Sequence, residues 1–109
     1  MFYWILAKIG ILCNDCTISN ENGKREVRGD PTEAALVNIG FKTGIDKQEL
    51  EQEFPRVNEI PFASERKMMT TLHKKNNEIS AYTKGAVDVI IEKCDRIWLE
   101  GEIKELTPE

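Results

Sequence analysis

The chain has 109 residues and a formal net charge of −4, with 40% hydrophobic and 31% charged residues. This length favours one domain, and this balance is typical of a soluble globular fold rather than a disordered chain. The acidic balance argues against a protein that binds nucleic acid through its phosphates. An acidic chain can still bind an anionic nucleotide where a few of its cations converge.

The start of the chain, MFYWILAKIGIL, is its most apolar stretch. It is too short to span a bilayer, Lys8 interrupts it, and it lacks the basic start and cleavage site of a signal peptide. We expect a helix over residues 3–13 that packs on the core, with Ile5, Ile9 and Leu12 on one side. Aromatic residues at the very start suggest a trimmed end, whose exposed apolar surface could drive dimerisation.

A polar hairpin and a capped helix are expected next. Residues 17–28 alternate loosely around Asn22-Gly23, and an Asn-Gly step between short strands predicts a hairpin. The segment that follows is a strong helix start, because Asp30 can act as N-cap, a proline comes next, and Glu33 can be the reciprocal capping carboxylate. Gly40 can end this helix.

The second half of the chain reads as strands flanked by helices. The expected elements are a short helix that Asp46 caps and Pro55 ends, strands at 57–62, 67–74 and 79–84, a helix at 86–93, and a hairpin of 96–99 with 102–106. The apolar stripe of the helix at 86–93 is expected at Val87, Ile90 and Ile91. Strands that follow one another favour an antiparallel sheet over a series of βαβ units. The predicted fold is therefore α+β, an antiparallel β-sheet with helices packed on its faces.

Cysteine and histidine spacing gives little support for a metal or redox site. Cys13 and Cys16 form a C-x-x-C, Cys94 stands alone, and His73 is the only histidine. A zinc site would need a second pair or nearby histidines, and a thioredoxin-like site would need a helix directly after the pair. We expect reduced cysteines, no metal ligands and no catalytic residue in this chain. P-loop and Rossmann glycine motifs are absent from the sequence as well.

Three short segments carry candidate binding residues. Phe62 follows a proline at a strand end, Lys84-Gly85 lies between a strand and a helix, and Glu33 opens a helix. Each has an ordinary structural interpretation: a core aromatic, a turn glycine beside a solvated lysine, and a helix cap. Together they could supply a stacking surface, a cation, a carboxylate and a close backbone approach for a nucleotide base.

The order of these segments resembles the nucleotide-binding (N) domain of P-type cation-transporting ATPases, in the calcium- and sodium/potassium-pump branch. The resemblance lies in Leu12-Cys13-Asn14-Asp15, Gly29-Asp30-Pro31-Thr32-Glu33-Ala34-Ala35-Leu36, Phe62-Ala63-Ser64-Glu65-Arg66-Lys67-Met68-Met69, Lys84-Gly85-Ala86 and Ile91-Glu92-Lys93-Cys94. It extends from about residue 5 to residue 106, and the combination of motifs is highly specific.

The resemblance implies a set of residues around an adenine nucleotide. Phe62 would stack on the adenine, Glu33 would hydrogen-bond near its amino group, Lys67 and Lys84 would line the pocket, Gly85 would let the base come close, and Ser64 and Met69 would be neighbours. Two departures stand out. Val87-Asp88 replaces the usual Pro-Glu, and Ser64 stands where several relatives carry an arginine that reaches the phosphates. Contact with the triphosphate is therefore expected to be weaker.

The resemblance also implies a function. Residues 1–109 would be a single nucleotide-binding domain, excised from a larger membrane pump and trimmed at both ends, with the N domain continuing past Glu109. The parent enzyme would transfer the γ-phosphate of ATP to an aspartate in a separate phosphorylation domain and so drive ion transport, with Mg²⁺ bound mainly outside this chain and an actuator domain as a further partner. The chain would be a cytoplasmic part of an integral membrane protein that binds ATP without hydrolysing it alone. The alternative is a non-catalytic interaction module with no nucleotide ligand.

Overall fold

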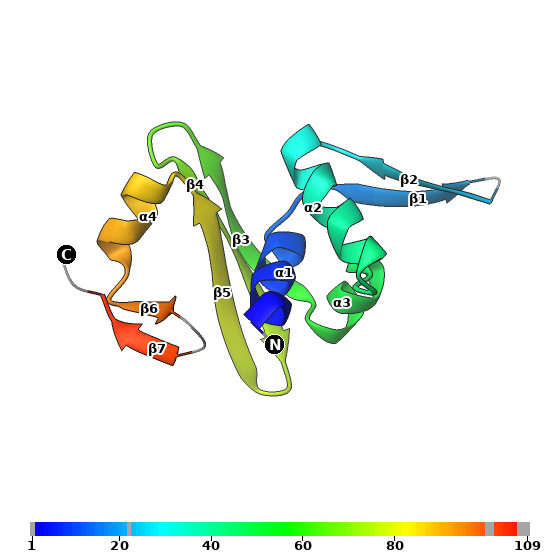
Figure 1. Cartoon of the computed structure of the whole chain (residues 1–109). Helices are drawn as coiled ribbons and strands as arrows, with labels where there is room; N and C mark the ends of the chain where they lie inside the picture. Colours follow the sequence, from blue (N-terminus) through cyan, green and yellow to red (C-terminus); the bar gives the residue numbers. More distant parts are fainter. Residues whose placement is uncertain (1, 22, 100–101, 107–109) are drawn as a thin grey trace.

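The computed structural model describes residues 2–21, 23–99 and 102–106 (Figure 1). In chain order the elements are α1 (Phe2–Leu12), β1 (Thr17–Glu21), β2 (Lys24–Arg28), α2 (Pro31–Lys42), α3 (Lys47–Glu53), β3 (Arg56–Ala63), β4 (Met68–Lys75), β5 (Glu78–Gly85), α4 (Val87–Lys93), β6 (Arg96–Leu99) and β7 (Glu102–Glu105). None of the described helices is long and apolar enough to cross a membrane.

The described strands form three antiparallel sheets. The central sheet has the order β3-β4-β5, and β1 pairs with β2 and β6 with β7 in two-stranded sheets. In Figure 1, α1, α2, α3 and the β1–β2 hairpin lie on one side of the central sheet, and α4 and the β6–β7 hairpin lie on the other. The predicted α+β class is confirmed, although the antiparallel strands are divided among three sheets.

The core lies where α1 meets α3 and the central sheet. Ile11, Leu12 and Leu50 are at most 4% exposed. Ala7, Ile45, Phe54 and Tyr82 pack partly buried against them. Burying each large aliphatic side chain contributes about 1.5–3 kcal/mol, so these contacts fix α1 on the sheet.

The apolar start of the chain is only partly covered. Leu6 is 64% exposed and Trp4 is 40% exposed on α1, while Ile5, predicted on the packed side, is 37% exposed. Lys8 places its ammonium 4.3 Å from the centre of the Phe54 ring, over an aromatic face. Dimerisation through this surface stays a prediction, which the sedimentation coefficient at several concentrations would test.

The prediction that Gly40 ends its helix is wrong. Gly40 is buried inside α2, and a Cβ added there would lie 2.4 Å from Cδ1 of Ile11. The glycine therefore serves the close packing of α2 on α1 and does not stop the helix. The chain turns after Lys42, where Gly44 has a φ of 93° in the left-handed region that favours glycine.

Two further expectations about local structure need correction. Lys67 was predicted in a strand, but it lies in the turn before β4 with a φ of 57°. The predicted apolar stripe of α4 is largely open, because Val87 is 75% exposed and Ile91 is 49% exposed. The antiparallel pairing of β1 with β2 confirms the first hairpin, whereas Asn22 of its turn and residues 100–101 of the last hairpin lie outside the described residues.

Candidate functional site

One face of the central sheet carries two of the predicted binding residues. Met69 and Lys84 pair directly across β4 and β5, so their side chains project from the same face. Ala63 pairs with Met68, whose side chain lies on the opposite face. Phe62 comes directly before Ala63, in the part of β3 where the register with β4 shifts between Ile60 and Ala63.

Glu33 reaches this face from the first turn of α2. Asp30 caps the helix, because its Oδ2 accepts hydrogen bonds from the N–H groups of Thr32 at 3.0 Å and Glu33 at 3.2 Å. The Glu33 carboxylate does not return to the cap as a capping box requires. Its Oε2 instead accepts from the N–H of Asp15 at 3.3 Å and from Nζ of Lys84 at 2.5 Å. The predicted reciprocal cap is therefore wrong, and the carboxylate faces the candidate site.

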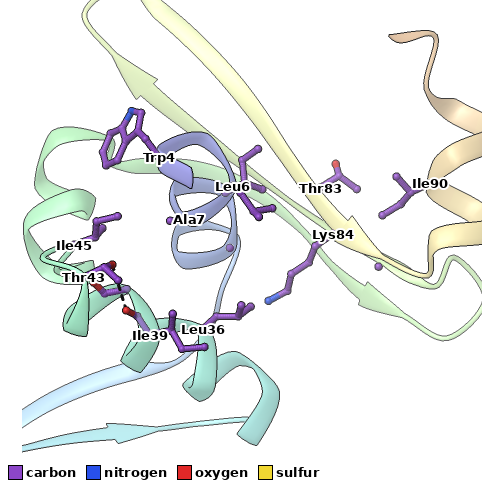
Figure 2. A pocket seen from close by; sticks show the side chains of 14 residues that line it. Trp4, Leu6, Ala7, Leu36, Ile39, Thr43, Ile45, Thr83, Lys84 and Ile90 are labelled. Carbon is purple, nitrogen blue, oxygen red and sulfur yellow. Dashed lines mark hydrogen bonds between the residues drawn. The ribbon is translucent and has the colours of Figure 1, made fainter. Parts of the chain in front are cut away.

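The pair of Lys84 and Glu33 bridges the sheet and α2. Figure 2 shows the Lys84 side chain leaving β5 and extending toward α2. The two side chains are 27% and 15% exposed, so the pair is shielded from most of the solvent and is screened by salt less than a surface ion pair. None of the hydrogen bonds in the described part of the chain ends on Oε1 of Glu33. That oxygen is chemically able to accept a hydrogen bond from an amino group.

A tight corner joins the end of β5 to the turn before β4. The N–H of Ala86 donates to the carbonyl of Lys67 at 3.0 Å. A Cβ on Gly85 would lie 2.2 Å from that carbonyl oxygen and 2.8 Å from Cα of Met68. The glycine is therefore needed for packing of main chain on main chain. Close contact between Gly85 and a base stays a prediction.

Phe62 is exposed, as is the turn that follows it. Its side chain is 60% exposed, so it is not the core aromatic of the ordinary interpretation. The N–H of Lys67 donates to the carbonyl of Ala63 at 2.7 Å and closes the turn that contains Ser64. Ser64 and Lys67 are both exposed, and no hydrogen bond or ion pair among the described residues joins their side chains to Glu33. The structure thus brings Glu33, Met69 and Lys84 together and leaves Ser64 at the rim.

A groove of about 870 Å³ runs beside β5, between α1, α2 and α4 (Figure 2). Its lining is mostly apolar and includes Leu6, Leu36 and Ile39. Only Lys84 and Gly85 of the predicted binding residues line it. The groove and the predicted binding face therefore meet at the end of β5 but do not coincide.

The cysteines of the C-x-x-C are buried and unpaired. Sγ of Cys13 donates to the carbonyl of Met69 and Sγ of Cys16 to the carbonyl of Asp30, each at 3.7 Å. Burial raises the pKa of both thiols, and the nearby Glu33 carboxylate raises that of Cys16 further. Thiols held neutral in this way are poor nucleophiles and poor metal ligands.

His73 is a structural residue. Its Nδ1 lies 2.8 Å from the carbonyl oxygen of Phe54, and its Nε2 lies 2.9 Å from Oγ1 of Thr71. Burial lowers the pKa of the imidazole, which favours the neutral ring. In the described part of the chain, no three His, Cys, Asp or Glu side chains gather as a metal site would require.

Residues outside the predicted set also contact the site. Asn14 and Asp15, in the loop after α1, hydrogen-bond to Glu33, and Arg56 at the start of β3 hydrogen-bonds to both of these loop residues. Sequence reasoning took Asn14-Asp15 only as the end of the first helix and assigned Arg56 no role. The available signal was the Leu12-Cys13-Asn14-Asp15 segment, which is part of the family resemblance.

Comparison with known proteins agrees with the geometry. A family model described as P-type ATPase, cytoplasmic domain N, matches residues 4–109. The chain belongs to this family. This N domain is 38% identical over 105 residues to a calcium-transporting ATPase of Lactococcus lactis and 43% identical over 104 residues to one of Listeria monocytogenes. It is 41% identical over 97 residues to a calcium-transporting ATPase of Bacillus cereus.

The N domain is a small part of those relatives. The alignments cover 96%, 95% and 89% of this chain, but only 12%, 12% and 10% of the three relatives. All three relatives are named calcium-transporting ATPases.

Proposed function

We propose that this chain is the ATP-binding domain of a calcium-type P-type ATPase. One observation carries the proposal: the partly buried ion pair of Glu33 and Lys84 lies at the sheet face from which Met69 projects. Phe62 is 60% exposed and offers a ring face for stacking. Oε1 of Glu33 can accept a hydrogen bond from the adenine amino group, and Lys84 supplies positive charge.

The remaining predicted residues complete the site. Lys67 lies at the rim with its side chain exposed, where it can approach the ribose or phosphates, and Ser64 is its neighbour in the same turn. The phosphates project away from the sheet, and Mg²⁺ accompanies them outside this chain. With one stacked ring and few phosphate contacts, the dissociation constant should be on the order of 0.1 to several mM.

The domain contributes positioning to the reaction of the parent enzyme. It holds ATP so that the γ-phosphate reaches an aspartate in a separate phosphorylation domain of the same protein, with the actuator domain as a further partner. Positioning accounts for a large share of phosphoryl-transfer catalysis. The domain lies on the cytoplasmic side of the membrane in the parent pump, and alone it binds ATP without turnover.

Titration of ATP into the isotopically labelled chain tests the proposal. Saturable amide shifts should cluster at Glu33, Phe62, Lys67 and Lys84-Gly85, and AMP should give a similar pattern because the base makes most contacts. No shifts at about 10 mM ATP, well above the expected dissociation constant, would contradict the proposal. Steady release of phosphate by the purified chain would contradict the separation of binding from catalysis.

A further inference from the structure

We propose that Asn14 is a positioning residue for Glu33. The loop of residues 13–16, here called the Asn14 loop, holds that carboxylate in place beside Lys84 and so determines how well the site accepts an amino group of a base. The inference rests on the proposed nucleotide-binding function. It assigns a function to the C-x-x-C segment, whose cysteines flank Asn14.

Asn14 joins the end of α1 to the start of α2. Its side chain is buried, and the residue is 1% exposed. The Nδ2 amide donates to the carbonyl of Gly10 at 3.1 Å and to the carbonyl of Glu33 at 3.0 Å. Oδ1 accepts from the N–H of Cys16 at 2.9 Å, so both polar groups of the amide are used. One side chain therefore fixes the main chain of Glu33 relative to α1.

The residue after Asn14 fixes the carboxylate itself. The N–H of Asp15 donates to Oε2 of Glu33 at 3.3 Å, and Lys84 donates to the same oxygen. Two consecutive loop residues thus contact the main chain and the side chain of Glu33. A shift of the Asn14 loop must move or release the carboxylate.

Two cationic side chains, those of Lys47 and Arg56, bind main-chain carbonyls at the start of the Asn14 loop. Nζ of Lys47 donates to the carbonyls of Ile11 at 3.2 Å and Asn14 at 3.1 Å. Nη2 of Arg56 donates to the carbonyls of Leu12 at 3.2 Å and Asn14 at 3.0 Å. The last carbonyls of a helix lack partners within the helix and carry its negative dipole end, so cations stabilise them. Lys47 is 3% exposed, which makes this support part of the core.

The Asn14 loop also connects to the sheet beside the site. Sγ of Cys13 donates to the carbonyl of Met69, the neighbour of Lys84 across β4 and β5. The loop therefore contacts α1, α2 and β4, while α3 and β3 supply its cations. A site that reads a base through a single carboxylate loses affinity when that carboxylate is misplaced by about 1 Å. The convergence of contacts on this loop gives Glu33 the necessary rigidity.

A double-mutant cycle on the 109-residue chain tests the inference. The dissociation constant for ATP is measured by amide shifts in the unaltered chain, Asn14→Ala, Glu33→Gln and the double variant. We expect each single change to weaken ATP binding about 3- to 10-fold, and the double variant to bind no more weakly than the weaker single variant. Multiplied losses in the double variant, or unchanged binding by Asn14→Ala, would overturn the inference.

Controls separate positioning from general loss of stability. Ile60→Ala removes apolar packing on the face of the sheet opposite to Lys84 and should leave ATP binding within about twofold, at a temperature where both variants are folded. An equal loss in Ile60→Ala would overturn the inference. If Asn14→Ala does not fold, Arg56→Gln replaces it in the cycle, because that side chain is 21% exposed and Asn14 itself is kept.

A measurement without ligand distinguishes this inference from the proposed function. The ¹³C shift of the Glu33 carboxylate should move in Asn14→Ala, or in Arg56→Gln where that variant replaces it, but not in Ile60→Ala. If the unaltered chain fails to bind ATP, the proposed function is wrong, and the carboxylate shift alone decides the positioning. An unmoved shift in the loop variant would overturn it.

Discussion

Replacing Phe62 by alanine separates binding from folding most cleanly. Because the side chain is 60% exposed, the change removes only part of the apolar burial of a phenylalanine. Full burial of such a side chain contributes about 1.5–3 kcal/mol, so Phe62→Ala should lower the free energy of unfolding by about 0.6–1.2 kcal/mol. A core phenylalanine would instead cost about 3–5 kcal/mol.

The same substitution should strongly weaken ATP binding. Stacking of a base on an aromatic side chain contributes about 1–3 kcal/mol, which corresponds to a loss in affinity of about 5- to 150-fold. Amide-shift titration gives the dissociation constant, and urea unfolding of the same samples gives the stability. The expected combination is a small loss of stability with a large loss of affinity.

Ile60→Ala is the matched control for this experiment. Ile60 lies on the same strand and is 50% exposed, but it pairs with Thr70, so it projects from the face opposite to Met69 and Lys84. Its replacement should cost a similar fraction of stability and leave ATP binding unchanged. A large stability loss in Phe62→Ala with unchanged affinity would refute the stacking role and favour an interaction module without a nucleotide.

Three further substitutions test the architecture around the site. Lys84→Met leaves the 15% exposed Glu33 carboxylate without its cation, so the free energy of unfolding, measured in urea, should fall by about 1–3 kcal/mol. Adding Glu33→Gln should recover part of this loss. Strictly additive effects of the two substitutions would contradict the pairing. Gly85→Ala should lower the free energy of unfolding by about 1–3 kcal/mol, because the added Cβ would lie 2.2 Å from a main-chain carbonyl oxygen. Gly10→Ala is the control, because its Cβ would lie 3.7 Å from the nearest atom. This change should stabilise α1 by up to about 1 kcal/mol. Burial lowers the pKa of the His73 imidazole in the folded chain, so the unfolded chain is protonated before the folded chain as the pH falls. The free energy of unfolding should therefore decrease as the pH is lowered from about 7.5 to about 5.5. His73→Asn should flatten this pH dependence, and an unchanged dependence would refute the assignment.

Local sequence signals identified the elements but not their tertiary roles. Asp30 followed by proline correctly indicated the start of α2, because capping depends on neighbouring residues only. The end of α2 was misplaced, because Gly40 meets Ile11 from a helix far away in sequence. A glycine that serves helix packing looks the same in sequence as one that ends a helix.

The site shows the same division between local and tertiary information. The capping-box pattern predicted that the Glu33 carboxylate would turn back to Asp30. The carboxylate instead binds Lys84 and the Asp15 amide. Local propensity depends on neighbouring residues only, so it could not predict these distant partners. The family resemblance placed Glu33 and Lys84 around one nucleotide, and the structure shows that their side chains form an ion pair. It attached no role to Asn14, because an asparagine after a helix is usually an ordinary terminator.

The two departures from the family pattern bear differently on binding. Val87 is 75% exposed in α4, and the corner at Gly85 depends on the hydrogen bond between the main chains of Ala86 and Lys67. The replacement of Pro-Glu by Val87-Asp88 should therefore not disturb the pocket. Ser64 is different, because it lies exposed in the rim turn, where a longer cationic side chain would extend toward the phosphates. A serine cannot supply that charge, and Lys84 is already paired with Glu33. The phosphates should therefore add little affinity, and ATP and AMP should bind with dissociation constants within a few-fold of each other, at about 0.1 to several mM.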